Sequence, residues 1–480
     1  MTRGGGPVEY GMLIDGSWDA GGDGRLEIRF PFDGSLVGRV PIASRADVEA
    51  AAACALDTHV RRPPLTPPIR FEVMSRVADL MAARAEELAR SLVLEVGKTI
   101  REAHAEVVAA IDAMRFAAEE AKRIHGETLP ADAIRGSERR IAFTLRVPGG
   151  PTCAITPFNA PLNQATHKVA CALAAGNPVV IKPSEETPLT TARFAQLFLE
   201  AQLPPGWLQV LYGPGETVGE WLLRDARFRR YTFTGSAAVG RHIRSVVGLR
   251  PSTMELGSNA PTIVHGDAVL ALAAEACLRS GYAIAGQVCT SVQRLYVQRG
   301  VLDEFLAIFA DKVKRLVLGN PLDERTDVGP MRSDEAATRA EEIVREAVQG
   351  GATLVAGGGR EGRLFAPTVL LNPPRTVRAV CEEIFAPIVS VIPYQDIDEA
   401  IAWANDSPYG LQAGVFTQSL DVAFAAAKRM QVGGLMINDA SRYRAPHLPY
   451  GGVKESGVGR EGPRYAIEEM TDLKLIVVNL

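Results

Sequence analysis

Short apolar runs alternate with longer amphipathic segments through the middle of the chain, and this alternation constrains the fold most strongly. Four runs are typical of buried strands and cover residues 153–156, 178–182, 208–211 and 230–234. Helical patterns follow three of these runs and open at Asn163, Thr190 and Ser236. Strands that alternate with helices predict a parallel sheet covered by helices on both faces. We therefore expect an α/β fold built around a wound parallel sheet.

A second α/β region begins near Ala260, with strands expected at 262–264 and 294–297 and a helix at 268–285. Long helical patterns precede the first region. After an early strand region at 26–40, Ser44 and Asp47 have the spacing of a capping box for a helix over 48–56. Apolar residues spaced by three and four predict two further helices, over 69–96 and 98–125.

Composition sets limits on the kind of protein. The 480 residues suffice for two or three domains, and 47% are hydrophobic and 22% charged, as in globular proteins. The net charge of −4 gives no reason to expect nucleic-acid binding. The glycine-rich start lacks the pattern of a signal peptide, and we expect a cytoplasmic protein without a membrane partner. The six cysteines lack CxxC spacing, so neither a metal site nor a disulfide framework is expected.

The segment Gly235 to Gly240 is a glycine turn between an expected strand and an expected helix. Backbone N–H groups at such a turn, together with the helix dipole, can hold a pyrophosphate. Lys182 and Glu185 follow another strand at its carboxyl end, where open α/β sheets bind ligands. These features favour a dinucleotide-binding domain, although a packing turn and a surface Lys–Glu pair remain the plainer alternatives.

Cys289 is a candidate nucleophile, because it follows Glu255, a candidate general base, in the second half of the chain. A thiolate attacks carbonyl carbon, and a carboxylate can then activate the water that hydrolyses the resulting thioester. Asn159, in a loop upstream, offers an amide donor that could join the Cys289 N–H in an oxyanion hole. In isolation each residue has a plain structural alternative: a packed thiol, a surface charge and a turn former.

Seven motifs occur in order along the chain: 157–162, 181–185, 233–236, 255–257, 286–289, 382–387 and 449–457. Through this ordered set the chain resembles the NAD(P)-dependent aldehyde dehydrogenase superfamily. Within the superfamily it is most similar to lactaldehyde and non-phosphorylating glyceraldehyde-3-phosphate dehydrogenases. The resemblance implies an enzyme that oxidises an aldehyde to an acid through a thiohemiacetal and a thioester on Cys289. It also implies secondary roles near the site for Lys168 and Glu461.

The resemblance also implies cofactor contacts from fourteen residues: Thr156, Pro157, Phe158, Lys182, Ser184, Glu185, Gly215, Phe233, Gly235, Ser236, Leu256, Gly257, Glu383 and Phe385. A carboxylate that accepts the ribose 2′-hydroxyl would repel a 2′-phosphate, so Glu185 favours NAD over NADP. The chain departs from the family at Ser258, where a glycine is usual beside the general base.

Substrate contacts are expected by resemblance from Tyr443, Arg444 and His447, with Met114, Phe116 and Ala160 as further candidates for the pocket. Arg442 and Arg444 could bind an anionic group, but cations on a loop are also commonly solvated. Val288 and Thr290 flank the nucleophile where phosphate-handling members often place Arg. We therefore expect a short hydroxy- or oxo-substituted aldehyde first and an anionic one second. The alternative function is a CoA-acylating semialdehyde dehydrogenase, which the presence of Glu255 disfavours.

The expected domain organisation has three parts. Residues 1–125 and 147–256 form the NAD(P)-binding domain, residues 257–455 the catalytic domain, and residues 126–146 and 466–480 a small β oligomerisation arm. The run 473–478 is apolar and β-prone, and such a strand needs a covering partner. We expect a homodimer or homotetramer.

Overall fold

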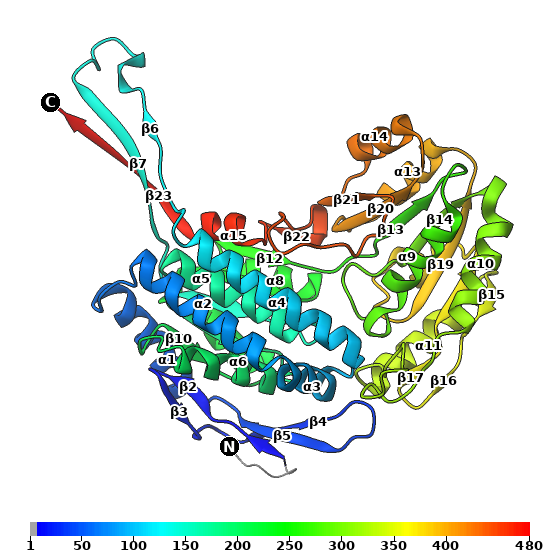
Figure 1. The fold of residues 1–480 in the computed structure, drawn as a ribbon, viewed down its shortest axis with the longest axis horizontal. Coiled ribbons are helices and arrows are strands. Elements are labelled where there is room, and N and C mark those ends of the chain that lie inside the picture. Colours follow the sequence, from blue (N-terminus) through cyan, green and yellow to red (C-terminus); the bar gives the residue numbers. More distant parts are fainter. Residues whose placement is uncertain (1–6) are drawn as a thin grey trace.

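A computed structural model describes residues 7–480, and the first six residues of the glycine-rich start lie outside the described residues (Figure 1). Two α/β lobes lie side by side, and a narrow arm projects from the first. The first lobe has an eight-stranded sheet in the order β22-β12-β11-β8-β9-β10-β2-β3. Its strands are β2 (Met12–Ile14), β3 (Ser17–Asp19), β8 (Thr152–Ile155), β9 (Val179–Lys182), β10 (Leu208–Val210), β11 (Arg230–Thr234), β12 (Ser252–Glu255) and β22 (Gly457–Val458).

The middle strands, β12 to β10 in that order, run parallel, and antiparallel strands complete the sheet at both ends. The wound parallel sheet expected from the alternating pattern is confirmed. The helices of this lobe are α1 (Arg45–Val60), α2 (Pro67–Ala83), α3 (Ala85–Val96), α4 (Ile100–Glu120), α5 (Pro161–Ala175), α6 (Pro188–Glu200), α7 (Glu220–Arg224), α8 (Ala237–Val247) and α15 (Pro463–Glu469). A small sheet of β1 (Val8–Glu9), β5 (Leu36–Pro41) and β4 (Arg25–Arg29) flanks them.

The capping box at the start of α1 is confirmed, because Ser44 and Asp47 each accept the other's backbone N–H. The single helix expected over 69–96 is wrong, since the chain leaves helical geometry at Arg84 (φ −116°, ψ 23°). Both α2 and α3 bury an apolar stripe, so the periodicity continues across the break and does not reveal it. Arg84 instead pairs with Glu200 on α6, with an Nη1 to Oε1 distance of 3.0 Å.

The second lobe has a seven-stranded sheet in the order β15-β18-β19-β14-β13-β20-β21. Its strands are β13 (Pro261–Val264), β14 (Arg294–Gln298), β15 (Thr353–Ala356), β18 (Thr368–Leu371), β19 (Ile388–Tyr394), β20 (Gln412–Phe416) and β21 (Gly434–Ile437), beside a hairpin of β16 (Arg360–Glu361) and β17 (Leu364–Phe365). Its helices are α9 (Leu270–Tyr282), α10 (Leu302–Lys314), α11 (Asp334–Gln349), α12 (Arg378–Cys381), α13 (Ile397–Asn405) and α14 (Leu420–Arg429). Each lobe has its own apolar core.

The helix expected over 268–285 ends earlier than predicted. It stops at Tyr282, because Ile284 and Ala285 both have φ 51°, in the left-handed region. Neither Ile nor Ala favours the left-handed conformation, so the sequence does not predict that the helix ends here.

Two chain crossings join the lobes and are bonded to each other. The first leads from β12 to β13, and the second returns from β21 to β22. The Leu256 N–H donates to the Ser456 carbonyl at 2.9 Å, and the Ser456 hydroxyl donates to the Gly257 carbonyl at 2.7 Å. The second lobe is therefore an insertion into the first, held by two adjacent segments.

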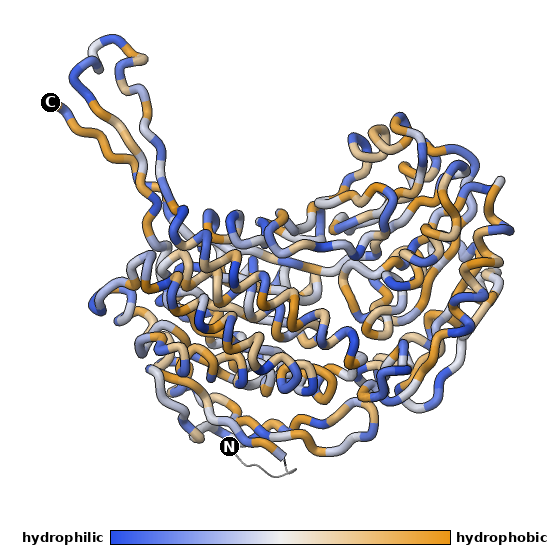
Figure 2. The backbone as a smooth tube through the Cα atoms, in the orientation of Figure 1, coloured by the Kyte–Doolittle hydropathy of each residue, from blue (hydrophilic) through white to orange (hydrophobic). Residues whose placement is uncertain are grey.

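The arm is a three-stranded sheet of β6 (Thr128–Leu129), β7 (Arg140–Pro148) and β23 (Thr471–Asn479). Strands β7 and β23 pair antiparallel over nine residues, from Thr471 opposite Pro148 to Asn479 opposite Arg140. Hydrophobic residues occur along both strands although they project from the molecule (Figure 2). Within residues 7–480, no helix is long and apolar enough to cross a membrane.

Candidate functional site

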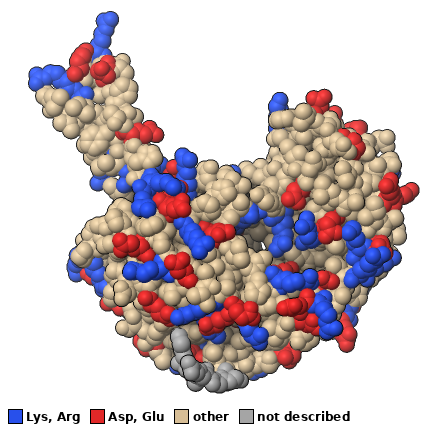
Figure 3. Space-filling model, in the orientation of Figure 1, with Lys and Arg blue, Asp and Glu red and all other residues tan. Residues whose placement is uncertain are grey.

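The cavity of interest lies between the two lobes and has a volume of about 840 Å³. The first lobe lines it with α4, the loop after β8 and the ends of β11 and β12, and the second lobe with the loop after α9 and the segment 442–450. Lys and Arg side chains gather around the hollow between the lobes on the face drawn in Figure 3. The carboxyl ends of the parallel strands β8, β11 and β12 therefore border the cavity between the lobes. Open α/β sheets bind ligands at this end of their strands.

Cys289 follows a turn of unusual backbone geometry. Ile284, Ala285 and Gly286 have φ values of 51°, 51° and 71°, and a Cβ at Gly286 would collide with the Ala386 carbonyl. The Ile284 N–H donates to the Glu102 carboxylate of α4 at 2.8 Å. The Glu102 carboxylate of the first lobe thus holds the strained segment that leads to Cys289 in the second lobe.

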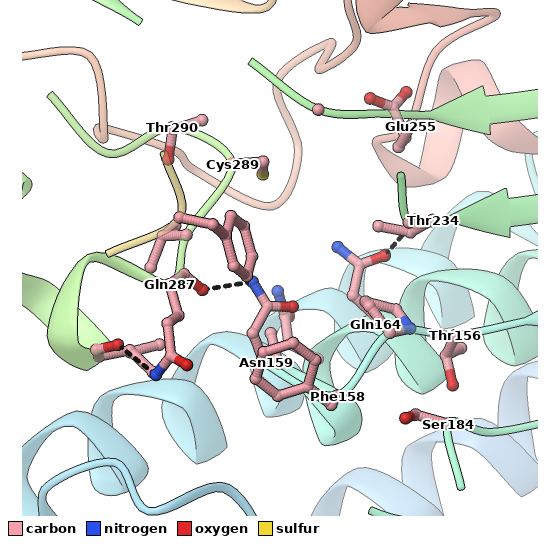
Figure 4. A pocket seen from close by; sticks show the side chains of 18 of the residues that line it. Thr156, Phe158, Asn159, Gln164, Ser184, Thr234, Glu255, Gln287, Cys289 and Thr290 are labelled. Carbon is pink, nitrogen blue, oxygen red and sulfur yellow. Dashed lines mark hydrogen bonds between the residues drawn. The ribbon is translucent and has the colours of Figure 1, made fainter. Parts of the chain in front are cut away.

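The Cys289 side chain lines the cavity, and its sulfur lies 3.2 Å from the hydroxyl of Tyr450 (Figure 4 shows the cysteine). Burial raises the pKa of the Cys289 thiol to about 11, and the Tyr450 hydrogen bond acts in the opposite direction. Tyr450 belongs to the motif 449–457, but its contact with Cys289 was not predicted from the sequence. It lies far from Cys289 along the chain, and an antiparallel bridge to Glu461 brings it to the site.

Asn159 lies in the loop after β8 and donates from Nδ2 to the Gln287 carbonyl at 2.9 Å (Figure 4). The main-chain carbonyl of Asn159 accepts a hydrogen bond from the Lys98 ammonium at 2.7 Å. Lys98 forms a buried ion pair with Glu106, whose other oxygen accepts the backbone N–H of Leu162 at 3.0 Å. An amide NH₂ has two donors, so Asn159 retains one beyond its bond to Gln287.

Glu255, the last residue of β12, is buried at the edge of the cavity (Figure 4). Both of its carboxyl oxygens are buried, and the described residues provide neither with a hydrogen-bond partner. Burial, aided by the negative charge of Glu461, raises the pKa of Glu255 well above its ordinary value. A carboxyl group that is buried, unpaired and next to a cavity is suited to proton transfer.

Lys168 and Glu461 form a buried ion pair beneath the cavity, with Nζ and Oε1 2.9 Å apart. Arg444 approaches the other Glu461 oxygen at 2.8 Å. Burial opposes the charge of Glu461, but the two cations hold the pKa of this carboxyl well below its ordinary value. His167, beside Lys168 on α5, lines the cavity, and burial lowers its pKa to about 3. His167 was not singled out from the sequence, because only the fold shows that this residue of α5 lines the cavity.

Twelve of the fourteen residues expected to contact the cofactor line the cavity: Thr156, Pro157, Phe158, Ser184, Gly215, Phe233, Gly235, Ser236, Leu256, Gly257, Glu383 and Phe385. The other two, Lys182 and Glu185, are adjacent to it. Glu185 accepts the Gly215 N–H at 2.6 Å and lies 3.4 Å from the Lys182 ammonium. Ser236 caps α8 by accepting the Val239 N–H, and both residues line the cavity.

This donor set fits a dinucleotide. The α8 terminus suits a pyrophosphate, and a fixed carboxylate beside a lysine suits a ribose. Glu383 accepts the Ser258 N–H at 2.9 Å, and burial raises the pKa of Glu383 to about 7. Phe158 and Phe385 meet edge to face with centroids 6.0 Å apart.

The residues expected to contact the substrate lie in different places. Arg444 lines the cavity, as does Arg442. Tyr443 is exposed, and His447 packs against Phe116 with ring centroids 5.0 Å apart and ring planes tilted by 38°. The cavity lining includes neither Tyr443 nor His447. Ala160 lines the cavity, whereas Met114 is fully buried in the core of the first lobe. Among residues 7–480, no cluster of His, Cys, Asp and Glu could hold a metal ion.

Residues 18–476 match the model of the aldehyde dehydrogenase family, and the chain belongs to that family. The 3-sulfolactaldehyde dehydrogenase of Priestia megaterium is 47% identical over 472 residues, which are 98% of either chain. The crystal structure of an NAD-dependent aldehyde dehydrogenase from Sinorhizobium meliloti matches with a TM-score of 0.95 and 36% identity, over 98% of this chain and 95% of that one.

A glyceraldehyde-3-phosphate dehydrogenase, GapN, from Methanocaldococcus jannaschii in complex with NADP matches with a TM-score of 0.91 and 36% identity, over 95% of this chain and 99% of that one. These relationships confirm the fold and the class of enzyme. The protein is an oxidoreductase that acts on the aldehyde group, with NAD or NADP as acceptor.

Proposed function

We propose that the protein oxidises a short, anionic 2-hydroxyaldehyde of the 3-sulfolactaldehyde type to the acid, using Cys289 as nucleophile. The observation that carries this proposal is that Cys289, Asn159 and Glu255 border one cavity together with Arg442 and Arg444, two of the four arginines that line it. The first three residues supply the chemistry, and the arginines supply a counter-charge for the substrate.

In the proposed mechanism the Cys289 thiol gives its proton to water, and the thiolate sulfur bonds to the aldehyde carbon. The carbonyl π electrons move to the oxygen and give a thiohemiacetal oxyanion. Asn159 Nδ2 and the Cys289 N–H donate to the oxyanion. The bound cofactor supplies the hydride acceptor. Once the hydride has left the carbon, a thioester remains on Cys289. Glu255 takes a proton from a water, whose oxygen bonds to the thioester carbon and releases the acid and the thiolate.

Support for an anionic substrate comes from the cavity wall and from one relative. Arg444 has five N–H donors, of which one nitrogen contacts Glu461. Arg442 lines the same cavity, and His167 and Gln164 add uncharged polar groups. The similarity to the Priestia megaterium enzyme favours a sulfonate as the anion. The same arginines would also bind a carboxylate or phosphate.

NAD is the proposed preference. Glu185 is held by the Gly215 N–H and by Lys182, and so its carboxylate is fixed where a ribose would bind. A 2′-phosphate next to this carboxylate would meet repulsion between like charges.

The test is the rate of NADH or NADPH formation with a panel of aldehydes: 3-sulfolactaldehyde, lactaldehyde, succinate semialdehyde, glyceraldehyde 3-phosphate and acetaldehyde. We expect the highest kcat/KM with 3-sulfolactaldehyde and NAD, and no turnover in Cys289→Ala. Arg442→Met should lower kcat/KM for the anionic aldehydes and leave acetaldehyde nearly unchanged. A preference for acetaldehyde would contradict the anionic substrate, and acyl-CoA formation in the presence of CoA would favour the acylating alternative.

A further inference from the structure

Tyr450 is the side chain whose hydroxyl contacts the sulfur of Cys289, and two backbone hydrogen bonds to Glu461 fix its main chain. The Tyr450 N–H donates to the Glu461 carbonyl at 3.0 Å, and the Glu461 N–H donates to the Tyr450 carbonyl at 2.7 Å. The tyrosine is buried, and its oxygen and the sulfur are 3.2 Å apart. Main-chain bonds therefore set the position of the phenol relative to the thiol.

Arg444 fixes the ring of the same tyrosine. The guanidinium carbon lies 3.9 Å from the ring centroid of Tyr450, and a guanidinium nitrogen lies 2.8 Å from Glu461 Oε2. Glu461 thus anchors both the backbone of the tyrosine and the cation on its ring. A cation over the ring face draws electron density from the phenol, which makes the O–H a stronger donor.

We propose that the Tyr450 hydroxyl donates a hydrogen bond to the Cys289 sulfur and stabilises its thiolate, with Arg444 and Glu461 holding the phenol in place. This role rests on the proposed function only in taking Cys289 as the nucleophile. The phenol remains a donor at neutral pH, because burial raises the pKa of Tyr450 well above its ordinary value. The charged groups around the sulfur act in both directions on the thiol pKa: Glu383 and Glu255 raise it, and Arg444 lowers it.

The test measures the reactivity of Cys289 and needs no substrate. The full chain, without cofactor, is treated with iodoacetamide across a pH series, and the labelled Cys289 peptide is quantified by mass spectrometry. Tyr450→Phe should raise the apparent pKa of the thiol by about one unit, which is roughly a tenfold loss of thiolate at neutral pH. Cys381, which is exposed, serves as an internal reference in the same samples.

Tyr465→Phe is the matched control, because it removes a phenol oxygen from α15 outside the cavity lining and should leave the Cys289 profile unchanged. An unchanged or lower pKa of the Cys289 thiol in Tyr450→Phe would overturn the proposal. The Tyr450 hydroxyl would then have no effect on the thiol, or would accept a hydrogen bond from the neutral thiol. If Tyr450→Phe does not fold, 3-fluorotyrosine placed at position 450 gives a more acidic phenol. It should lower the thiol pKa, and no shift would overturn the proposal.

The outcome is separable from that of the proposed function. If the alkylation profile shifts as expected while no aldehyde is oxidised, the contact between Tyr450 and Cys289 stands and the proposed function fails. If aldehydes are oxidised and the profile does not shift, only the role of Tyr450 fails.

Discussion

Glu255 and Glu461 are two buried carboxyl groups whose environments drive their pKa values apart. Lys168 and Arg444 pair with Glu461 and lower its pKa. Burial and the negative charge of Glu461 both oppose the ionisation of Glu255 and raise its pKa. Separated pKa values of this kind divide the work between neighbouring carboxyl groups. We propose that Glu461 acts as an anchor and that Glu255 exchanges a proton.

For Glu255 we expect a rate of thioester hydrolysis that rises with pH, because a base with a raised pKa gains its active form only as the pH increases. Glu255→Gln should keep a first burst of reduced cofactor and lose roughly 10²-fold or more of steady-state turnover. Rapid-mixing absorbance measures both phases. Cys289→Ala is the control and should lose the burst as well. A variant that lost burst and turnover together would show that Glu255 is needed before hydride transfer.

The proposed catalytic residues Cys289, Glu255 and Asn159 could be singled out from the sequence because each lies in a short motif with a chemical meaning. The contacts that orient it could not. Tyr450 reaches Cys289 through an antiparallel bridge, and Glu102 reaches Ile284 across the space between the lobes. Such pairings arise only when distant segments meet in the fold, and no local pattern encodes them.

The first turn of helix α6 contacts the buried carboxyl group of Glu95, a residue of α3. Glu95 accepts the N–H groups of Leu189 and Thr190, both at 2.6 Å, and the hydroxyl of Thr190. These bonds satisfy donors that the first turn of a helix leaves open. Burial nevertheless outweighs them and raises the pKa of Glu95 to about 7.

This shift predicts a pH-dependent stability. Between about pH 4.5 and 7 the folded chain retains a proton on Glu95 that the unfolded chain releases, so the free energy of unfolding falls as the pH rises, by about 3 kcal/mol for this group. Glu95→Gln should flatten that part of the profile, measured as Tm against pH. Glu72→Gln, at an exposed site on α2, is the control and should keep the slope of the unmodified protein. An equal slope in Glu95→Gln would contradict the prediction.

Element types were predicted well and element ends less well. The strand at Arg230–Thr234 and the capping box of α1 are as expected, since both depend on local chemistry. The break at Arg84 and the end of α9 depend on tertiary contacts. Arg84 pairs with α6, and the left-handed turn after Tyr282 is held by Glu102 of α4. At Gly286 the Ala386 carbonyl leaves no room for a Cβ.

In the whole molecule, the arm exposes apolar surface that a single chain does not cover. Leu473, Leu475 and Val477 lie on one face of β23 and are 62%, 57% and 51% exposed. The strand is also at the edge of its sheet, where main-chain groups can pair with another strand. Both features support the expected association of identical chains.

We therefore expect a mass in solution that is two or four times the 51.5 kDa of one chain. Leu475→Lys should lower it, because a charge on the apolar face would have to be buried on association. Lys474→Ser, on the opposite face of β23, is the control and should leave the mass unchanged. Light scattering after gel filtration measures both. A mass of 51.5 kDa for the unmodified protein would refute this expectation.

The two bonded crossings between the lobes also have a consequence for how such enzymes diversify. The segment between them begins after Glu255 and ends before Gly457, and its two ends lie next to each other on the edge of the first sheet. Recombination at these two points would exchange a complete lobe, with its cysteine and its arginines, while the sheet that receives it stays closed. A chimaera with the second lobe of a relative should therefore fold and carry much of that relative's choice of aldehyde.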